Sequence, residues 1–402
     1  MAGPYYVDNV NGNDQDIAIA GDGDYTHIGA TLVKIGAFAN AAVGYLIDIT
    51  GGTNITPGLY QILTNADNDT VTLTTQPGTG DVSDVSVDSN DGLSEAQAFA
   101  TPCKARHIAA SNEKCHVQGG TPYTTEDGAN DCVMYVDVAG AGGSTPIVWE
   151  AYTTVPGDGG IVTIDADTNT LASAVKTGIG GWVRAVFKNF KFTGGSGDGF
   201  DANGTTDNGI KFINCQFDNN DGWGCQGGSG FYFIKCTANN NGGGGIDAVG
   251  VWYYGLKCYT NNGIGISNVA TAISGLFYDN GAHANIYSFS GGAVFILNNT
   301  VDGENAADSI GYYQANNIHG LSLIFNNIFH DLDTGIKSNT TNQETSYSDY
   351  NLFNSNNTDR TNIAVGDNDV AAVPDFEDEA ADDYRIKSTS SAYKAGFDAG
   401  EI

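Results

Sequence analysis

The sequence has few positive charges and no long apolar run. Only 16 of its 402 residues are Lys or Arg, against 47 Asp and Glu, so the formal net charge is −31 at pH 7. Such a surface repels phosphate backbones and anionic lipids, which excludes nucleic acid and membrane surfaces as partners. No segment reaches the roughly 18 apolar residues that a membrane-spanning helix needs.

Other features are also scarce. The first residues, MAGPYYVDNVNGND, lack the basic and apolar regions of a secretory signal peptide, so none is expected. The seven cysteines are an odd number, which argues against a complete disulfide framework. Proline occurs 8 times, whereas glycine occurs 55 times and clusters with Asn and Asp. This composition is typical of many short strands joined by tight turns.

One short pattern is repeated through the middle of the chain: an apolar segment, a cysteine, two or three Asn residues, then glycines. It appears as IKFINCQFDNNDGWG, FYFIKCTANNNGGGG and WYYGLKCYTNNGIG. Strand-like repeats at intervals of 20 to 26 residues, without a helical period, predict a parallel β-helix with one coil per repeat. The apolar residues on which the repeats align are Phe200, Trp223, Ile246, Ile266, Ile286, Ile310 and Ile336.

Stacked coils place equivalent residues in columns, with neighbours about 4.8 Å apart. Thiols in such a column pack as small apolar groups, and stacked Asn amides hydrogen-bond to one another. Because a linear stack does not converge on an ion, the column predicts core packing rather than a metal site. The residues expected in one inward column are Phe190, Cys215, Cys236, Cys258, Asn299, Asn327 and Asn351.

The motifs NNTVDG, NNIFHD and GGGGIDAVG resemble those of the pectate-lyase-like superfamily of right-handed parallel β-helix proteins. YYVDNVNGND and SNDGLSEAQAFATPCKARHIAA are similar to the N-terminal motif of bacterial and phage β-helices, in which a strand, a turn and a short helix cap the solenoid. VPDFEDEAADDYRIKSTSSAYKAGFDAG resembles their C-terminal close. The resemblance implies an all-β fold with an N-terminal capping helix. It does not identify a function, because lyases, hydrolases, adhesins and tailspikes share this fold.

A segment inserted into the N-terminal motif alternates apolar and polar residues, with GGTNITPG and ADNDT as turns. It predicts a small antiparallel β module of about five strands over residues 20–88. The other expected parts are a cap strand at 1–19, the β-helix at 89–363 and a closing segment at 364–402. Similar modules in phage virion proteins make the insertion a candidate docking element, and a neutral insertion in an exposed turn is the alternative.

Two carboxylate pairs are candidates for acid–base chemistry. Asp198 and Asp221 are expected in one column, about 4.8 Å apart, which is near the separation of a retaining glycosidase pair. Asp201 and Asp247 are expected two coils apart, about 9.6 Å, at the upper edge of the inverting range. Trp223 beside them would be a sugar platform. Ordinary turn chemistry is the favoured interpretation of these residues, and calcium bound by Asp198 and Asp221 is an intermediate one.

Lysines form a second candidate group. Lys235 and Lys257 precede Cys236 and Cys258, so they are expected to point outward on adjacent coils. Such a strip, with Tyr259 beside it, would suit a uronate or sulfated sugar, and either lysine could act as the base of a lyase. Ordinary pairing with turn aspartates is favoured over both.

Complete catalytic motifs of the known enzymes with this fold are absent. No Gly-His-Gly or Asn-Thr-Asp occurs in a coil, and none of the arginines lies in the middle coils, where a pectate lyase places its base beside calcium. No two histidines have the spacing of metal ligands on one coil. His319 and His330 are therefore expected on the surface or in turns.

We therefore expect a bacteriophage virion structural protein, tailspike-like or capsid-associated, with a carbohydrate-facing β-helix. A polysaccharide lyase or glycoside hydrolase acting on an extracellular polysaccharide is the alternative, and a surface adhesin is the third possibility. The expected partners are other virion proteins, a cell-surface polysaccharide and, by resemblance to virion β-helices, further copies in a homotrimer. The expected location is the virion, or the extracellular space after lysis. Calcium is the one cofactor considered, and none is required.

Overall fold

The computed structural model confirms the all-β fold class and the parallel β-helix. It describes residues 5–7, 19–38, 43, 46–88, 100–102, 113–126, 130–136, 146–167, 170–178, 182–202, 207–281, 283–289, 292–304, 306–315, 321–339, 346–390 and 392. Most of the segment expected to form the capping helix lies outside these residues. In the described part of the chain, no helix is long and apolar enough to cross a membrane.

The chain divides into two compact units, Met1–Lys191 and Phe192–Ile402. The first unit contains a closed antiparallel barrel with the strand order β2-β3-β6-β5-β4-β7. Its strands are β2 (Ile19–Thr26), β3 (Thr31–Val33), β4 (Leu46–Gly51), β5 (Gly58–Asp67), β6 (Thr70–Leu73) and β7 (Val82–Asp88). Where about five strands were expected, six are present, because the short β3 closes the barrel against β2 and β6.

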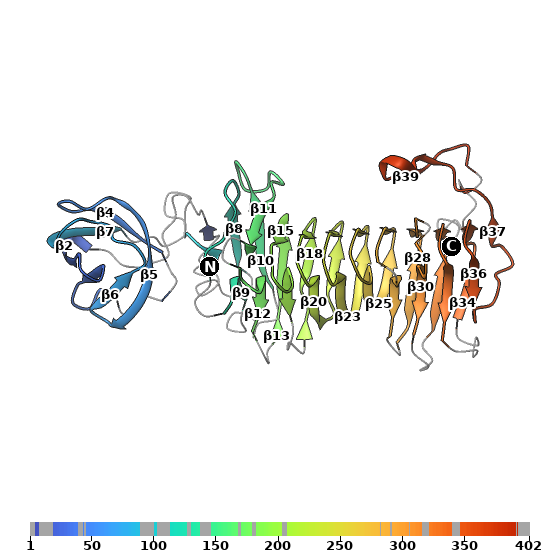
Figure 1. Ribbon diagram of the computed structural model, residues 1–402, viewed down its shortest axis with the longest axis horizontal. Helices are drawn as coiled ribbons and strands as arrows, with labels where there is room; N and C mark the ends of the chain where they lie inside the picture. The colour runs from blue at the N-terminus through green and yellow to red at the C-terminus, as the bar shows by residue number, and fades with distance from the viewer. Residues whose placement is uncertain are drawn as a thin grey trace. The chain divides into compact units, whose positions relative to one another are not determined.

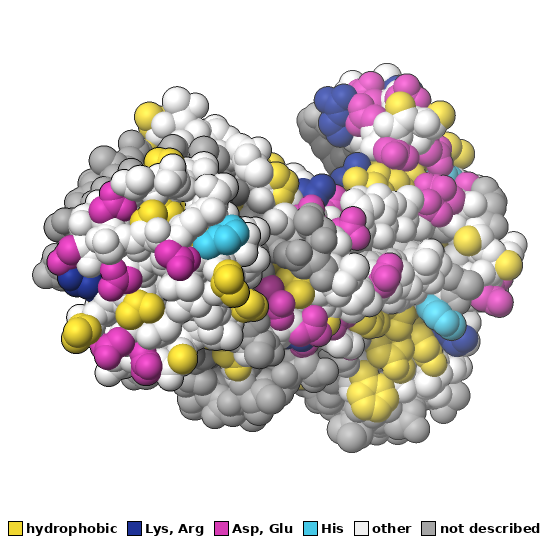
Figure 2. Space-filling model, turned by 60° about the vertical axis from the view of Figure 1, so that its left-hand side comes forward, with side chains coloured by type: hydrophobic (Ala, Val, Ile, Leu, Met, Phe, Trp, Pro, Cys, Tyr) yellow, Lys and Arg dark blue, Asp and Glu magenta, His cyan; other side chains and the backbone are white. Residues whose placement is uncertain are grey.

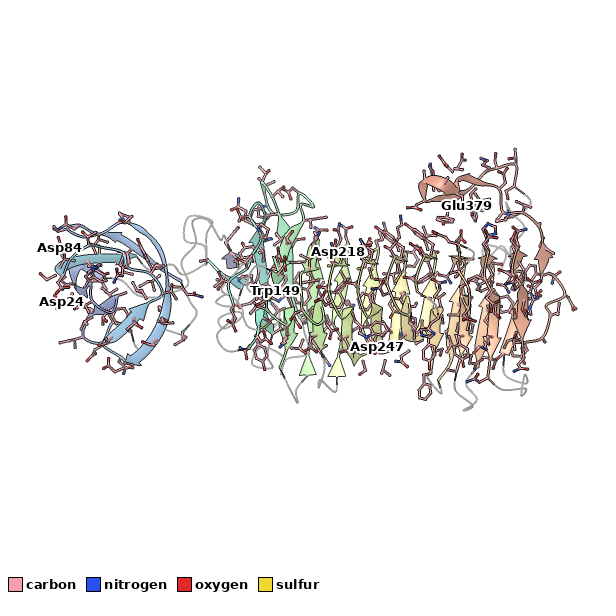
Figure 3. The ribbon with its side chains drawn as sticks, in the orientation of Figure 1. Asp24, Asp84, Trp149, Asp218, Asp247 and Glu379 are labelled. Atoms are coloured by element: carbon pink, nitrogen blue, oxygen red, sulfur yellow. The ribbon has the colours of Figure 1, made fainter. Side chains whose placement is uncertain are left out.

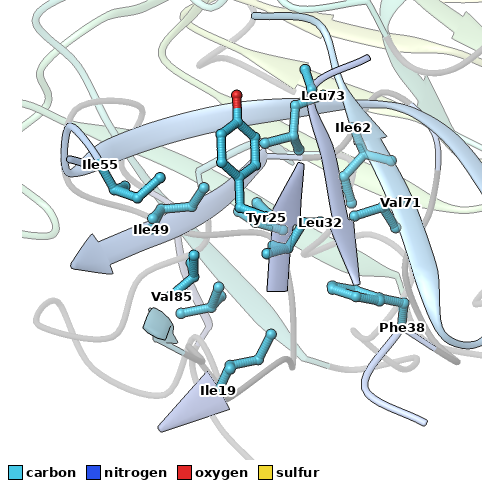
Figure 4. Close-up of a cluster of buried hydrophobic side chains, with 13 residues drawn as sticks. Ile19, Tyr25, Leu32, Phe38, Ile49, Ile55, Ile62, Val71, Leu73 and Val85 are labelled. Carbon is cyan, nitrogen blue, oxygen red and sulfur yellow. The ribbon is translucent and has the colours of Figure 1, made fainter. Parts of the chain in front are cut away.

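The barrel has its own apolar core, which explains why its sequence alternates. Strand β6 buries Val71 and Leu73 and turns its two threonines outward. Figure 4 shows these residues with Tyr25, Leu32 and Phe38, all of them buried in one cluster. A barrel leaves no free strand edge, so this segment has the core and the closure of an independent module.

The first unit also contains the first coils. Strand β1 (Tyr5–Val7) pairs in parallel with β8 (Lys114–Gln118), so the chain on either side of the inserted barrel meets in one sheet. Strand β8 pairs in turn with β10 (Ile147–Tyr152), and β10 pairs with β14 (Ala185–Lys188). The remaining strands here are β9 (Cys132–Val136), β11 (Val162–Asp165), β12 (Ser173–Thr177) and β13 (Trp182–Val183), and the chain leaves the unit within β15 (Phe190–Thr193).

The second unit is a solenoid of about seven turns, which follow one another along its axis in Figure 1. Each coil contributes one strand to each of three rows, and all pairings between coils are parallel. The first row consists of β18 (Lys211–Ile213), β21 (Tyr232–Ile234), the C-terminal parts of β23 (Gly244–Tyr254) and β25 (Ile266–Ile273), then β28 (Val294–Leu297), β31 (Ser322–Phe325) and β34 (Ser346–Asp349).

The second and third rows complete each coil. The second row consists of β19 (Gln216–Asp218), β22 (Thr237–Asn239), β24 (Lys257–Tyr259), β26 (Leu276–Tyr278), β29 (Thr300–Asp302), β32 (Ile328–His330), β35 (Leu352–Asn354) and β37 (Val370–Ala371). The third row consists of β16 (Phe200–Ala202), β20 (Trp223–Ser229), the N-terminal parts of β23 and β25, then β27 (Ala284–Ser288), β30 (Ile310–Gln314), β33 (Thr334–Ser338) and β36 (Thr358–Thr361). Strand β17 (Asp207–Asn208) is a short strand outside the three rows.

Asn pairs build one turn in several of the coils. The first Asn of a pair adopts a left-handed conformation, as at Asn298 and Asn326 with φ of 57° and 59°. The second Asn points inward and donates to the next coil: Asn299 Nδ2 lies 3.0 Å from Asn327 Oδ1, and Asn327 Nδ2 lies 2.9 Å from Asn351 Oδ1. The expected Asn column is therefore present as a continuous hydrogen-bonded ladder between the first and second rows.

A second ladder, between the second and third rows, was not predicted. It joins Asn220, Asn241, Asn261 and Asn280 through side-chain hydrogen bonds of 2.9, 2.9 and 2.8 Å. Gly224, Gly245 and Gly265 form a column of glycines beside this second ladder. A Cβ at Gly224 would lie 2.6 Å from the Gly245 carbonyl oxygen and 2.9 Å from Asn241 Nδ2, so only glycine fits beside the ladder.

The first ladder ends on a charged pair. The backbone N–H of Asn351 donates to Asp369 Oδ1 at 2.8 Å, and Asp369 is paired with Arg360. Both side chains are nearly buried, and the Arg360 guanidinium lies over the Phe353 ring, with its carbon 3.9 Å from the ring centroid. The last Asn of the first ladder thus finds an acceptor within the chain.

The register corrects the alignment of the repeats at three places. Phe200 pairs with Cys225 rather than Trp223, and Ile336 pairs with Tyr312 rather than Ile310. Thr237, which follows Cys236, is paired with Lys257 on the next coil. The residue that stacks on Cys236 is therefore Leu256, which precedes Lys257. Cys258 stands two residues further on, opposite Ala238. All three cysteines of that prediction are buried and form no disulfide bond, but only Cys215 and Cys236 share a column.

The C-terminal segment folds back as a hairpin of β38 (Phe376–Asp378) and β39 (Asp383–Ile386), joined by the single-turn helix η5 (Glu379–Ala381). Phe376 and Tyr384 form a buried cluster with Tyr278 of the second row. The ring centroid of Tyr278 lies 5.2 Å from that of Tyr384. The hairpin therefore covers part of the second row's outer face.

Candidate functional site

The outer face of the first row carries many apolar and aromatic side chains, and much of it faces solvent. Two columns of side chains lie on this face over seven coils, and Thr271, which is buried, interrupts the exposed part of one of them. One column is Lys211, Tyr232, Trp252, Thr271, Phe295, Leu323 and Tyr347, and the other is Ile213, Ile234, Tyr254, Ile273, Leu297, Phe325 and Asp349. An exposed apolar face of this extent is typical of a binding surface. We call it the aromatic face.

Three exposed aromatic side chains of the aromatic face gather around Trp252. Trp252 and Tyr254 have exposed fractions of 48% and 52%, and Tyr232 has 36%. The rings of Tyr232 and Trp252 stack with centroids 6.1 Å apart and planes 25° apart. Lys211 extends the stack by one coil, with its Nζ 5.3 Å from the Tyr232 ring centroid. The site thus combines flat apolar rings with one cation in a line along the solenoid axis.

The sequence of one strand carries a signal for this site. In VWYYG, the odd–even alternation of a strand sends Trp252 and Tyr254 to one side and Tyr253 to the other. Tyr253 is indeed 2% exposed and stacks on Phe233 in the core, with ring centroids 5.3 Å apart. Two large aromatic side chains on the outer side of one strand could have been recognised as a candidate surface.

The structure separates the first predicted carboxylate pair. Asp198 lies opposite Trp223, one coil away, and its Oδ1 accepts a hydrogen bond of 2.7 Å from the Trp223 backbone N–H. Asp221 is exposed in the turn before Trp223, beside the backbone of residues 195–197. The expectation that Asp198 and Asp221 share a column is wrong, because the third row is shifted by two residues from the predicted register.

The second predicted pair does share a column. Asp201 is opposite Gln226, and Gln226 is opposite Asp247, so the two carboxylates stand two coils apart as expected. Asp247 Oδ1 accepts hydrogen bonds from Ser267 Oγ at 2.7 Å and Asn268 Nδ2 at 3.0 Å. Figure 3 shows Asp247 at the edge of the solenoid opposite to that of Asp218. These bonds give Asp247 a structural role within the third row.

The predicted sugar-binding residues lie at three separate places. The Trp223 ring packs over Gly244 of the next coil, where a Cβ would collide with it. Lys235 is a left-handed turn residue with φ of 52°, and its side chain lies over Gly255. Lys257 does not follow Lys235 in a column but projects from the second row, with its Nζ 4.7 Å from the Tyr259 ring centroid. The strip of lysines predicted from the sequence is therefore not formed.

Tyr259 belongs to the hairpin contact rather than to an open platform. Its ring stacks on Tyr278 with centroids 4.9 Å apart and planes 5° apart, and it packs against the hairpin cluster. Burial raises its pKa above the usual value. Lys257 Nζ also lies 5.1 Å from the Tyr278 ring centroid, so this lysine is held over both rings.

His330 was expected at the surface or in a turn, and this expectation is wrong. It lies in strand β32, with 7% of its surface exposed, beneath the C-terminal hairpin. Its imidazole contacts the carboxylates of Asp331 and Glu379. His319 lies outside the described residues. The strand position of His330 could be predicted from NNIFHD, but the covering hairpin comes from far along the chain.

Charge is unevenly distributed around these sites. In Figure 2, acidic side chains are scattered over the visible face, whereas Lys and Arg side chains are few. The hydrophobic side chains on this face gather in patches. A chain of this charge would repel an acidic ligand except where a cation such as Lys211 stands beside the aromatic rings.

No family model and no curated protein matches the chain. Among solved structures, a pectate lyase is similar over 78% of this chain and 90% of its own, with 16% identity and a TM-score of 0.49. The A-module of a mannuronan C-5 epimerase from Azotobacter vinelandii covers 65% of this chain and 89% of its own, with 15% identity and a TM-score of 0.35. A rhamnogalacturonan lyase covers 72% and 88%, with 14% identity and a TM-score of 0.37. Each is a distant likeness, and none assigns an activity to this chain.

Proposed function

We propose that this protein binds an extended polysaccharide along the aromatic face. The observation that carries the proposal is the exposed, stacked pair of Tyr232 and Trp252, with Tyr254 beside it in the neighbouring column. Exposed aromatic rings supply large apolar contact area at little cost in side-chain entropy, because only two torsions are ordered. The C–H faces of sugar rings match such surfaces.

The form of the site favours a linear ligand. Both columns of the aromatic face run along the solenoid axis, so a chain lying on them meets equivalent side chains every coil, about 4.8 Å apart. A neutral polysaccharide, or one with a few acidic groups near Lys211, is compatible with the charge of −31. A second copy of the chain would carry the same charge and be repelled at long range, which makes it the less favoured occupant.

The predicted carboxylates support binding better than cleavage. Asp198 and Asp247 are engaged in hydrogen bonds that shape turns and strand ends. A lyase or hydrolase that used them would have to break these bonds in its reaction. Binding without turnover is therefore the proposed activity, and the virion setting stays a prediction from the sequence.

The test is affinity for a panel of soluble polysaccharides, including neutral glucans, polyuronates and alginate, measured by affinity gel electrophoresis and calorimetry. Trp252→Ala is expected to lower the affinity for the bound polymer about tenfold or more, since one lost aromatic contact is worth about 1.4 kcal/mol. Phe289→Ala is the matched control, because Phe289 is also an aromatic residue with 55% exposure but lies outside both columns.

Two results would contradict the proposal. One is affinity that Trp252→Ala leaves unchanged or that Phe289→Ala lowers equally. The other is a stable oligomer in analytical ultracentrifugation that dissociates in Trp252→Ala, with no affinity for any polymer. That second outcome would identify the aromatic face as a subunit interface. Product release from any polymer, lost in Asp247→Asn, would show an enzyme instead.

A further inference from the structure

A histidine and two carboxylates from three distant segments meet under the C-terminal hairpin. Asp302 ends strand β29, and His330 ends β32 directly opposite it. Glu379 comes from η5 of the hairpin, where Figure 3 labels it. One carboxylate oxygen of Asp302, one of Glu379 and one ring nitrogen of His330 all lie within 4.8 Å of one another.

Both ring nitrogens of His330 face oxygen atoms. Its Nδ1 lies 3.3 Å from the Asn354 backbone oxygen, to which an N–H at this position can donate. Its Nε2 faces Glu379 Oε1 at 3.1 Å, and a metal ion that displaces the proton between these two atoms would be bound by both. A histidine that donates its far N–H to a backbone carbonyl is the usual arrangement of a metal ligand.

Asp302 has an oxygen without a partner. The side chain is 1% exposed, and its Oδ1 accepts a hydrogen bond of 2.9 Å from the Glu304 backbone N–H. Among the residues that the structure describes, no group donates a hydrogen bond to the buried Oδ2. Leaving a buried carboxylate oxygen unsatisfied is costly, so a missing partner is indicated.

Carboxylates surround the imidazole from several sides. His330 Nε2 lies 3.1 Å from Glu379 Oε1 and 3.7 Å from Asp331 Oδ2. Asp302 stands directly opposite His330 on the neighbouring coil.

We propose that Asp302, His330 and Glu379 bind a divalent transition-metal ion, with Zn²⁺ as the best match. An imidazole nitrogen with carboxylate oxygens suits zinc, whereas Ca²⁺ and Mg²⁺ take oxygen ligands. Metal–ligand bonds of about 2.0–2.1 Å place two tetrahedral ligands about 3.3 Å apart. The 3.1 Å between His330 Nε2 and Glu379 Oε1 already fits, and the Asp302 oxygen lies within 4.8 Å of both atoms.

The surroundings leave room for water on the ion. His330 and Glu379 also line a cavity of about 400 Å³, together with Asp331, Asn354 and Asp375. Three protein ligands with an open side match a site whose fourth position is taken by water. The ion would join two coils to the hairpin, so its binding adds to the stability of the folded chain.

The test is Zn²⁺ binding to the full chain stripped with a chelator, measured by competition with a chromophoric chelator. We expect one ion per chain, and a rise in melting temperature on adding Zn²⁺. Asp302→Asn, His330→Gln and Glu379→Gln are each expected to lower Zn²⁺ affinity at least about 100-fold, since each removes a direct ligand. Co²⁺ in place of Zn²⁺ should give a visible absorption spectrum that His330→Gln abolishes.

Glu377→Gln is the matched control, because it removes one charge from the same hairpin two residues from Glu379, at an exposed position. Glu379→Gln lies near the surface and should fold in any case, which keeps the test valid if a buried variant does not. Absence of Zn²⁺ binding would overturn the proposal. So would equal affinity for Ca²⁺ and Zn²⁺, or an equal loss in Glu377→Gln, because both indicate a general attraction to acidic residues.

Discussion

Asn299 Nδ2 donates a hydrogen bond of 3.0 Å to Asn327 Oδ1, one coil further along the solenoid, and the Asn299 backbone N–H donates to the same oxygen at 2.9 Å. Asn327→Ala removes this acceptor and leaves two buried donors unsatisfied. We expect a loss of about 3 kcal/mol in the free energy of unfolding. Denaturant titration followed by circular dichroism measures it.

The control for this change is Asn262→Ala, at an exposed turn position of the second unit. It is expected to change the free energy of unfolding by less than about 0.5 kcal/mol, as exposed substitutions usually do. If both variants unfolded at the same denaturant concentration, the ladder would contribute nothing beyond ordinary turn preference.

Gly224→Ala tests the glycine column. The added Cβ would approach the Gly245 oxygen and Asn241 Nδ2, both belonging to the next coil, which cannot move without opening the ladder. We expect a loss of about 2–3 kcal/mol or failure to fold. Gly80→Ala, where a Cβ meets nothing within 4 Å, is the comparison variant. Wild-type stability in Gly224→Ala would refute the close approach of the coils.

The thiols of Cys215, Cys236 and Cys258 are expected to resist labelling in the folded protein. All three are buried, and burial raises the pKa of Cys258 far above that of a free thiol, so little thiolate forms. Titration with a thiol reagent should find these cysteines silent in native buffer and fully reactive in denaturant. Rapid labelling of the native chain would contradict the inward orientation of these columns.

Folding stability should fall in mild acid through His116. Its ring is buried in β8, and this burial lowers its pKa below 6.5, with Lys114 adding to the shift and Glu150 opposing it. The unfolded chain therefore binds the proton more readily. The contribution of neutral His116 is complete above about pH 6.5 and decreases as the pH falls toward the folded-state pKa, by at most about 1.4 kcal/mol per pH unit.

The measurement compares urea unfolding of the parent and His116→Gln between pH 7 and pH 5. The variant lacks the titrating group, so its stability should fall less steeply over this interval. Identical pH slopes for the two proteins would show that His116 takes up its proton equally in the folded and unfolded states.

The coil repeat could be predicted from the sequence because each coil repeats an inward apolar strand and an Asn-containing turn. The register could not be fixed fully, because a slip of two residues keeps every side chain on its own face. Because of this, the sequence alone does not decide whether Trp223 or Cys225 is opposite Phe200, or whether Ile310 or Tyr312 is opposite Ile336. Backbone pairing decides between them, and it favours Cys225 and Tyr312.

The candidate sites differ in how far the sequence could have revealed them. Trp252 and Tyr254 lie in one strand, so their shared side follows from alternation alone. Asp302, His330 and Glu379 are brought together by two coils and a returning hairpin, and no local spacing relates them. The approach of Asp198 to the Trp223 amide depends likewise on the shape of a turn, which composition does not specify.

Asp369 at the end of the first Asn ladder has a consequence for polymerisation. A stack of identical coils has no intrinsic length, and its last coil would offer open amide donors and an unpaired strand edge to another molecule. Here the Asp369 carboxylate accepts the hydrogen bond from the Asn351 backbone N–H, at the position where a further Asn would lie. The Arg360 guanidinium, which lies over the Phe353 ring, pairs with this carboxylate. The first ladder thereby ends in a charged pair that a further Asn-containing coil cannot extend, so we expect it to disfavour end-to-end growth of this repetitive β-structure into fibres.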